Sequence, residues 1–341
     1  MRSPGLPLGE RMIAAEKRKL GKIGPAVLPI GLGCYSLSGA YGKIDDQAGI
    51  DFIHQAIDLG MDHLDSSDMY GWGHNETLLG KALKGRRDRI LLTSKFGQIQ
   101  SPDGDHRIDG RPAYVMQACE ASLARLKVDV IDVYYQHRID PTVPIEETIG
   151  AMSRLIEQGK VRYLALSEAR PETIRRAHAA HPLVAVQTEF SLLYRREAME
   201  TLEVTRKLGI AFVAYAPLGR SLLTGQHADP GALAEGDTRR RHPRFAKDNL
   251  AHNRRLVQPI EAMAAKKGCT PAQLALAWVL AQGDDIIALP GTKRIERLKE
   301  NLGALDVKLT PAEIAQLADA IPVGAAAGGR YPGHALEKTF R

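Results

Sequence analysis

Apolar, strand-like runs alternate along this chain with amphipathic, helix-like segments at intervals of roughly thirty residues. Eight apolar runs follow one another, at residues 27–33, 63–71, 90–97, 130–138, 161–169, 184–193, 210–219 and 285–293. The segments between them carry helix signals. Residues 45–60 begin with two aspartates and end in glycine, and residues 112–127 open with proline. An acidic cap, a terminal glycine and a proline at the first position are typical of helix ends.

Eight repeats of strand then helix predict a parallel sheet with helices outside it, and eight strands are enough to close a barrel. The alternative, a doubly wound Rossmann sheet, should show a G-x-G-x-x-G loop after the first strand. Residues 31–39 instead read GLGCYSLSG, with Ser36 at the third glycine and no helix opening there. We therefore predict a single (β/α)8 TIM barrel over residues 16–341, preceded by a flexible extension at residues 1–15.

Two irregular segments complete this prediction. The connection after the seventh strand, from Gly219 to about Ala251, is longer than a compact domain needs. Loops of that length are usually functional or mobile. The barrel is expected to end in a C-terminal tail.

Composition adds limits on the class of protein. The 341 residues are 44% hydrophobic and 25% charged, the balance of a globular enzyme. The net charge of +6 is mild and only 5% of residues are aromatic, which argues against nucleic-acid binding. Cys34, Cys119 and Cys269 match no zinc spacing, so no metal is expected. Without a recognisable signal peptide or membrane span, we expect a cytoplasmic protein. An oligomer is possible but nothing indicates one.

Four chemically versatile residues follow successive predicted strands. Asp65 ends the second strand, with Tyr70 five residues later, Lys95 ends the third, and His137 ends the fourth. Barrel enzymes place catalytic groups at these strand ends. Each residue alone has a structural explanation, such as a helix cap, a rim ion pair or a satisfied core histidine. Four of them on one rim favour a catalytic site.

Carbonyl reduction gives these four residues a common purpose. The reaction needs a hydride on carbon and a proton on oxygen, and Tyr70 could donate that proton although a free tyrosine has a pKa of about 10. The ammonium of Lys95 is expected to lower the pKa of Tyr70, with Asp65 as the counter-ion that a buried lysine needs. Neutral His137 could donate a hydrogen bond to the carbonyl oxygen.

The same segments resemble the aldo-keto reductase superfamily over essentially the whole chain. The resemblance rests on DSSDMYG at residues 65–71, where the family usually has D-T-A-x-x-Y-G, and on TSKFG, YYQHR, ALSEA, VQTEFSLL, YAPLG and PGTKRIERLKENLGA further along. Other stretches look most like the branch that contains pyridoxal reductases and broad-specificity bacterial and plant carbonyl reductases. The chain departs from the pattern at Ser66 and Ser67, at Ser221 where glycine is common, and at Tyr35.

This resemblance implies an enzyme that uses NADP(H) to reduce an aldehyde or ketone reversibly, with Tyr70 as proton donor. The family's catalytic tetrad falls on the four residues above. Binding of the nicotinamide is implied for Ser167, Glu168, Gln187 and Tyr215, with Gly33 and Cys34 close by. The remaining cofactor contacts implied are Pro217, Leu218, Gly219, Gly291, Thr292, Lys293, Arg297, Glu300 and Asn301. Tyr35 and Trp72 would narrow the mouth of the substrate site.

The implied phosphate contacts have a physical basis. Lys293 and Arg297 are expected one helical turn apart at the start of the last barrel helix, where a 2′-phosphate would be favoured. In the long loop Arg239, Arg240, Arg241 and Arg244 could also fold onto the phosphates, although a run of charges is more often simply solvated.

Two other functions remain open at this point. The barrel could be a regulatory, redox-sensing subunit that binds the cofactor with little turnover. A metal-dependent hydrolase is the less favoured alternative, because it would need more histidine and aspartate ligands at the strand ends. The sequence does not name the substrate, which is expected to be a small carbonyl or alcohol.

Overall fold

Eight parallel strands form one sheet whose order follows the sequence. The computed structural model describes residues 15–100, 106–226, 231, 233–336 and 339–340. The strands are β3 (Leu32–Gly33), β4 (His63–Asp65), β5 (Leu91–Phe96), β8 (Ile131–Gln136), β9 (Val161–Ser167), β10 (Leu183–Glu189), β11 (Ala211–Tyr215) and β12 (Ile286–Leu289). Parallel bridges from Ile30 to Ala288 and from Gly33 to Gly291 join the two ends of the sheet. The predicted (β/α)8 barrel is confirmed, and the Rossmann alternative is wrong.

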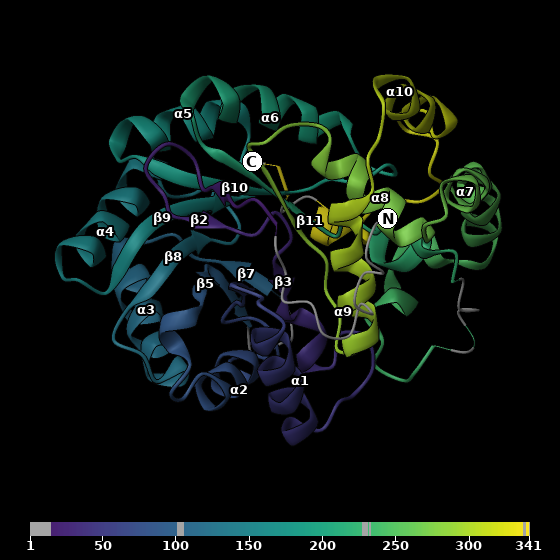
Figure 1. Ribbon diagram of the computed structural model, residues 1–341. Coiled ribbons are helices and arrows are strands. Elements are labelled where there is room, and N and C mark those ends of the chain that lie inside the picture. The colour runs from purple at the N-terminus through teal and green to yellow at the C-terminus, as the bar shows by residue number, and fades with distance from the viewer. Residues whose placement is uncertain (1–14, 101–105, 227–230, 232, 337–338, 341) are drawn as a thin grey trace.

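Helices surround these strands, as Figure 1 shows. They are α1 (Asp46–Asp58), α2 (His74–Ala82), α3 (Pro112–Leu126), α4 (Ile145–Glu157), α5 (Pro171–Ala180), α6 (Arg196–Leu208), α8 (Pro271–Leu280) and α9 (Ile295–Leu302). Local sequence sets their starts. The Asp45 carboxylate accepts the first amides of α1, and Thr270 and Gln273 form a capping box at α8. No helix in the described part of the chain is long and apolar enough to span a membrane.

Two apolar layers hold the barrel together. The inner layer fills the barrel with strand side chains such as Val133, Tyr135 and Val213, and the outer layer packs the strands against the helices. A hairpin of β1 (Arg18–Lys19) and β2 (Ala26–Val27) adds Leu20 and Val27 to the inner layer and closes the end where the strands begin. The predicted extension before this hairpin lies, except for Ala15, outside the described residues.

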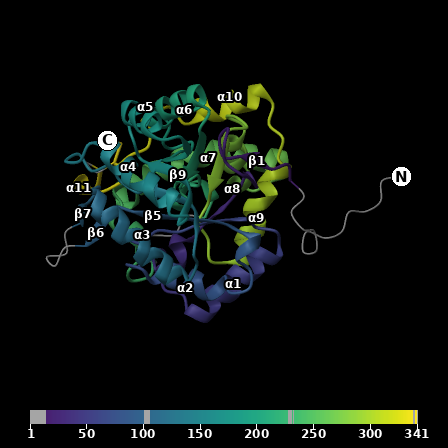
Figure 2. The same cartoon turned by 90° about the vertical axis from the view of Figure 1, so that its left-hand side faces the viewer.

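The opposite end carries the irregular segments. There β6 (Gln98–Gln100) pairs with β7 (His106–Ile108), and Figure 2 shows this hairpin and α11 (Gly333–Leu336) together, at the far end from β1. The predicted long loop is present but shorter than expected. It contains the short helices η3 (Gly219–Thr224), η5 (Thr238–Arg241) and η6 (Pro243–Phe245), and helix α7 (Lys247–Lys267) then begins. Helix α10 (Pro311–Ala320) precedes the C-terminal tail. Parts of the chain distant in sequence therefore meet where the strands end.

Candidate active site

A cavity of about 350 Å³ lies at the C-terminal ends of the strands. Nine of the residues predicted for the site line it, namely Gly33, Tyr35, Asp65, Tyr70, His137, Ser167, Gln187, Tyr215 and Gly291. Its lining also includes residues that the sequence analysis did not single out, such as Tyr41, Arg138 and Tyr331. The lining does not include Cys34, Trp72, Glu168, Pro217, Leu218, Gly219, Thr292, Lys293, Arg297, Glu300 or Asn301.

Lys95 connects two of the predicted catalytic residues beneath this cavity. Its Nζ lies 2.5 Å from Asp65 Oδ2, 2.8 Å from the Ser66 carbonyl oxygen and 3.3 Å from Tyr70 Oη. The lysine side chain is fully buried, so its charge depends on the adjacent carboxylate. Gln187 donates to the other oxygen of Asp65 at 3.0 Å. The arrangement places a charged donor against the phenol at the edge of the cavity.

The pKa of Tyr70 differs from the expectation. Burial raises the pKa of this phenol well above its usual value, and the Asp65 carboxylate raises it further. This direction is the opposite of the lowering expected from Lys95, because the cost of burying a phenolate beside a carboxylate outweighs the attraction of nearby positive charge such as that of Arg138. Burial also lowers the pKa of Lys95, which Asp65 opposes. Tyr70 is consequently protonated at neutral pH and can act as a proton donor.

His137 lies beside this pair, directly after β8. Its ring approaches the Tyr70 ring edge-on, with 6.0 Å between the centroids. Its Nδ1 lies 3.0 Å from Ser67 Oγ. Burial lowers the pKa of His137 well below its usual value, and the charges of Arg138 and Lys95 lower it further. The imidazole is therefore neutral, with one nitrogen as donor and the other as acceptor.

Tyr215 shows how the C-terminal tail joins the site. Its Oη lies 2.9 Å from Tyr331 Oη and accepts a hydrogen bond from Arg330 at 3.2 Å. The same guanidinium donates to both carboxylate oxygens of Glu168, at 2.9 and 2.6 Å. Glu168 has a positive φ of 57° and its carboxylate binds this arginine. The tail therefore builds one wall of the predicted nicotinamide site.

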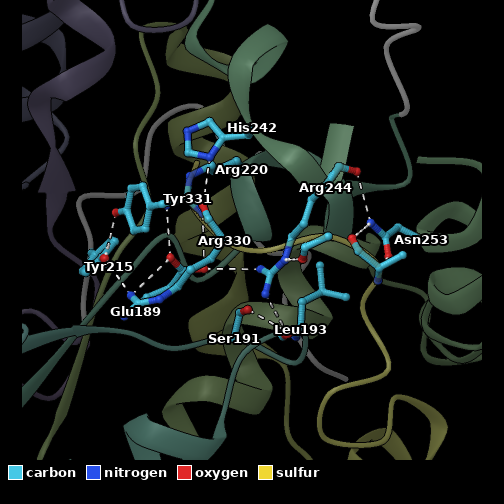
Figure 3. A network of polar contacts seen from close by, with 12 residues as sticks. Glu189, Ser191, Leu193, Tyr215, Arg220, His242, Arg244, Asn253, Arg330 and Tyr331 are labelled. Atoms are coloured by element: carbon cyan, nitrogen blue, oxygen red, sulfur yellow. Dashed lines mark hydrogen bonds and ion pairs between the residues drawn. The ribbon is translucent and has the colours of Figure 1, made fainter. Parts of the chain in front are cut away.

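A second buried carboxylate extends this network, which Figure 3 shows. Glu189 at the end of β10 accepts two hydrogen bonds from Arg220, at 3.2 and 3.0 Å, and one from Arg244 at 3.4 Å. Arg330 lies 3.7 Å from the same carboxylate. Glu189 could have been found as the single charged residue of its strand, LVAVQTE. Arg330 has no comparable local signal, since its partners are distant in sequence.

The four arginines of the long loop have different environments. Arg239 binds Asp237 and Ser221, and Arg240 donates to the Leu233 carbonyl oxygen. Arg244 is the buried partner of Glu189 described above. Arg241 is exposed and lines the cavity. Of the four, Arg241 is thus the one whose position suits contact with a bound molecule.

The predicted 2′-phosphate contacts are arranged differently from the expectation. Helix α9 begins at Ile295, so Lys293 precedes the helix and the expected one-turn spacing from Arg297 is wrong. Lys293 Nζ donates to the carbonyl oxygens of residues 41–43, at 2.6 to 3.1 Å. Arg297 forms an ion pair with Glu300 at 2.5 Å. Both cations therefore have partners within the chain.

Of the two residues predicted to narrow the substrate site, only Tyr35 lines the cavity. Tyr35 packs on Tyr70 with 4.7 Å between ring centroids and lines the cavity. Trp72 is 40% exposed and lies outside the lining.

Ser221, where the sequence departs from a common glycine, has a φ of 85°. A non-glycine residue in this region is strained. In the described part of the chain, no group of three histidine, cysteine or acidic residues is placed to hold a metal.

Comparison with known proteins gives one consistent result. The model of the aldo/keto reductase family matches residues 29–322. The chain is 46% identical over 315 residues to a probable aldo-keto reductase of Glycine max, covering 92% of this chain and 91% of the relative. It is 44% identical over 326 residues to an aldo-keto reductase of Schizosaccharomyces pombe that is named for NADP(+), covering 94% and 96% of the two chains.

Solved structures agree with these relatives. A glycerol dehydrogenase of Gluconobacter oxydans matches with a TM-score of 0.81 at 28% identity, over 90% of this chain and 95% of that one. An aldo-keto reductase of Klebsiella pneumoniae, solved in complex with NADPH, matches with a TM-score of 0.72 at 27% identity, over 93% and 98% of the two chains.

Proposed function

The chain belongs to the aldo/keto reductase family, and from that premise we propose how its own residues carry out the reaction. The protein is an NADP-dependent oxidoreductase that reduces an aldehyde or ketone to an alcohol, reversibly. Asp65, Tyr70, Lys95 and His137 are its catalytic residues in this proposal. The observation that carries the proposal is the position of Lys95 Nζ, which contacts both Asp65 and Tyr70 below the cavity.

In this proposal the nicotinamide end of the cofactor enters the cavity, and its phosphates lie at the rim. Gly33 and Gly291 meet at the seam of the barrel, where a Cβ on Gly291 would lie 3.3 Å from the Gly33 carbonyl oxygen, so glycine keeps this part of the rim open. The N-terminus of α9 has no side-chain cap. The positive end of this helix, together with the side chains of Arg294 and Arg297, suits a phosphate.

The nicotinamide end has matching groups inside the barrel. Ser167 and Gln187 line the cavity and offer the donor and acceptor atoms that a carboxamide needs. Tyr215 also lines the cavity, and in this proposal its ring is the aromatic face on which the flat nicotinamide stacks. We assign Glu168 a supporting task, since its carboxylate is held by Arg330, which also fixes the Tyr215 hydroxyl.

Side chains of the protein supply the proton for the carbonyl oxygen and orient the carbonyl group. When bound, the reduced nicotinamide supplies the hydride. Tyr70 Oη donates its proton to the carbonyl oxygen as that oxygen gains negative charge. The ammonium of Lys95, 3.3 Å away, stabilises the phenolate that remains, and Asp65 keeps the ammonium charged. His137 Nε2 donates a hydrogen bond to the same carbonyl oxygen, polarising and orienting it.

We propose further that the substrate is a small carbonyl compound or alcohol that enters beside Tyr35. We also propose that the protein is located in the cytoplasm. No feature of the described residues favours the regulatory alternative over turnover.

A comparison of two tyrosine variants tests the proposal. Tyr70→Phe keeps the ring and removes the proton donor, so kcat for NADPH-dependent reduction of an aldehyde panel should fall roughly 10²–10⁴-fold. The affinity for NADPH, followed by fluorescence, should stay nearly unchanged. Tyr163→Phe, near the start of β9, is the matched control and should keep parental activity. Activity retained by Tyr70→Phe would remove Tyr70 from the proposed role.

A further inference from the structure

Ser67 Oγ forms a hydrogen bond with Nδ1 of His137, at 3.0 Å. Ser67 follows β4 and is fully buried, and His137 follows β8. This serine stands where the D-T-A-x-x-Y-G pattern has alanine, which has no hydroxyl. The contact is therefore a feature of this chain's own sequence.

The tautomer of His137 depends on this contact. A neutral imidazole carries its proton on one nitrogen, and the partner of the other nitrogen decides which. If Ser67 donates to Nδ1, then Nε2 carries the proton. If Nδ1–H donates to Ser67 instead, Nε2 is left with a lone pair. Only the first arrangement gives the N–H that a substrate oxygen requires from His137.

The single proton of the Ser67 hydroxyl has three possible acceptors. They are His137 Nδ1 at 3.0 Å, Asp68 Oδ1 at 3.3 Å and the Lys95 carbonyl oxygen at 3.5 Å. The Met69 amide donates to the same Oγ at 3.3 Å. The shortest contact favours donation to His137, and an ionised Asp68 is the strongest competitor because hydrogen bonds to charged groups are stronger.

We propose that Ser67 is a positioning residue whose hydroxyl donates to His137 Nδ1 and so places the proton on Nε2, and that Asp68, once ionised, withdraws that hydroxyl and reverses the tautomer. The inference rests on the proposed role of His137 in carbonyl reduction. Ser67 touches neither substrate nor cofactor in this account and acts through the imidazole.

The surroundings of Asp68 set the pH at which this change occurs. Burial raises the pKa of Asp68 to about 8, and the Glu76 carboxylate raises it further, whereas Arg125 lowers it. Tyr114 and Tyr134 also face Asp68, and both have raised pKa values. Glu76 has its own partner in Arg125, at 2.7 Å. Asp68 is therefore mainly protonated at pH 7, and it ionises above about pH 8.

Nuclear magnetic resonance of the imidazole nitrogens tests the tautomer directly. Long-range ¹H–¹⁵N spectra of the whole protein without cofactor, with His137→Asn to assign the signals, should show His137 protonated at Nε2 at pH 7. Between pH 7 and 9.5 the parent should change toward the Nδ1-protonated form. Asp68→Asn should keep the Nε2-protonated form throughout, and Ser67→Ala should lose the pH-linked change.

Enzyme kinetics supply the second readout. Ser67→Ala should lower kcat at pH 7 roughly tenfold, equivalent to about 1.4 kcal/mol, with little change in KM for NADPH. Asp68→Asn should keep most of the parental kcat and move the alkaline fall in kcat to higher pH. Ser36→Ala is the matched control, because Ser36 is buried and its Oγ has no hydrogen-bond partner among the described residues.

Two results would overturn the inference. One is a parent protein with His137 protonated at Nδ1 at pH 7, and the other is a Ser67→Ala variant whose tautomer and pH profile match the parent. Failure of the proposed function would look different, since a parent that reduced no carbonyl with NADPH could still show the predicted tautomer by resonance.

Discussion

Arg330 and Glu168 form a buried, two-point ion pair across 162 positions of sequence, with Arg330 Nη1 and Nη2 at 2.9 and 2.6 Å from the two carboxylate oxygens. This ion pair connects the C-terminal tail to the residue that follows β9. Because Arg330 also donates to Tyr215 and lies near Glu189, one residue of the tail connects both buried carboxylates with a cavity-lining aromatic.

Replacing Arg330 should lower the stability of the folded protein. Arg330→Met leaves Glu168 buried without its partner, and breaking a buried ion pair on one side costs about 3–5 kcal/mol. The free energy of unfolding from urea titration should fall by that amount. Arg176→Met is the matched control, since Arg176 makes the same two-point contact with Glu146 on the exposed surface. Exposed pairs contribute about 0–1 kcal/mol. Equal losses in the two variants would contradict the importance of burial.

The ion pairs of Glu168 and Glu189 with arginines predict how the stability of the folded protein depends on pH. Burial acts to raise the pKa of Glu168 and Glu189, but the arginines outweigh it and hold both pKa values below the usual range. A glutamate in the unfolded chain has a pKa of about 4.3, so below that pH the unfolded chain binds more protons than the folded protein does. The stabilisation is present above that pH and is lost as the pH falls through the folded pKa values.

Unfolding in urea between pH 7 and pH 3 measures this dependence. The parent should lose stability steeply below the unfolded pKa, and Arg330→Met should show a shallower decline because its Glu168 lacks the arginine that lowers the pKa. Parallel curves for the two proteins would show that the pair does not contribute to the acid dependence.

A third prediction concerns Lys95 and Asp65. Lys95→Met removes the donor to Tyr70 and leaves Asp65 as an unpaired buried carboxylate, so kcat should fall at least 10²-fold. Asp65→Asn keeps the amine, but without the carboxylate the already lowered pKa of Lys95 falls further. The kcat of Asp65→Asn should therefore be low at pH 7 and recover as the pH is lowered.

The pH dependence separates these two variants. Lys95→Met should show no acid recovery, because it has no ammonium to restore. If pH–rate profiles of both variants had the shape of the parental profile, Lys95 and Asp65 would not act together as proposed. Circular dichroism of both variants checks that a loss of kcat does not come from unfolding.

The sequence predicted the barrel and much of the cavity because both depend on local patterns. Alternating strands and helices fix the fold, and catalytic groups at strand ends converge in any closed barrel. Asp65, Tyr70 and His137 therefore line one cavity, with Lys95 just beneath it. The N-terminal hairpin was not predicted, since its two strands have only two residues each.

Long-range pairing explains what sequence reasoning missed. Arg330 follows a stretch rich in alanine and glycine, and nothing nearby indicates that its partners are on β9 and β10. The pKa of Tyr70 was misjudged for a similar reason. The neighbouring charge was predictable from spacing, but the degree of burial of the phenol depends on the assembled cavity.

Arg297 and Lys293 should set the preference of the enzyme for NADPH over NADH. Both have partners inside the chain, Glu300 for Arg297 and the carbonyl oxygens of residues 41–43 for Lys293. A 2′-phosphate beside the uncapped start of α9 would offer each cation a charged acceptor in place of these partners. Hydrogen bonds to charged groups contribute about 1.5–3 kcal/mol each, so two contacts favour NADPH over NADH by roughly 10²-fold or more.

Binding of both cofactors to matched variants measures this preference. Lys293→Ala with Arg297→Ala should remove most of it, by weakening NADPH while leaving NADH nearly unchanged, because NADH has no 2′-phosphate to lose. Lys299→Ala, on the same helix, is the control and should keep the parental ratio. Titration of each protein with NADPH and NADH, followed by fluorescence, gives the two affinities. The assignment fails if the parent binds NADH as tightly as NADPH, or if the double variant weakens both cofactors equally, since either result means that these cations do not read the 2′-phosphate.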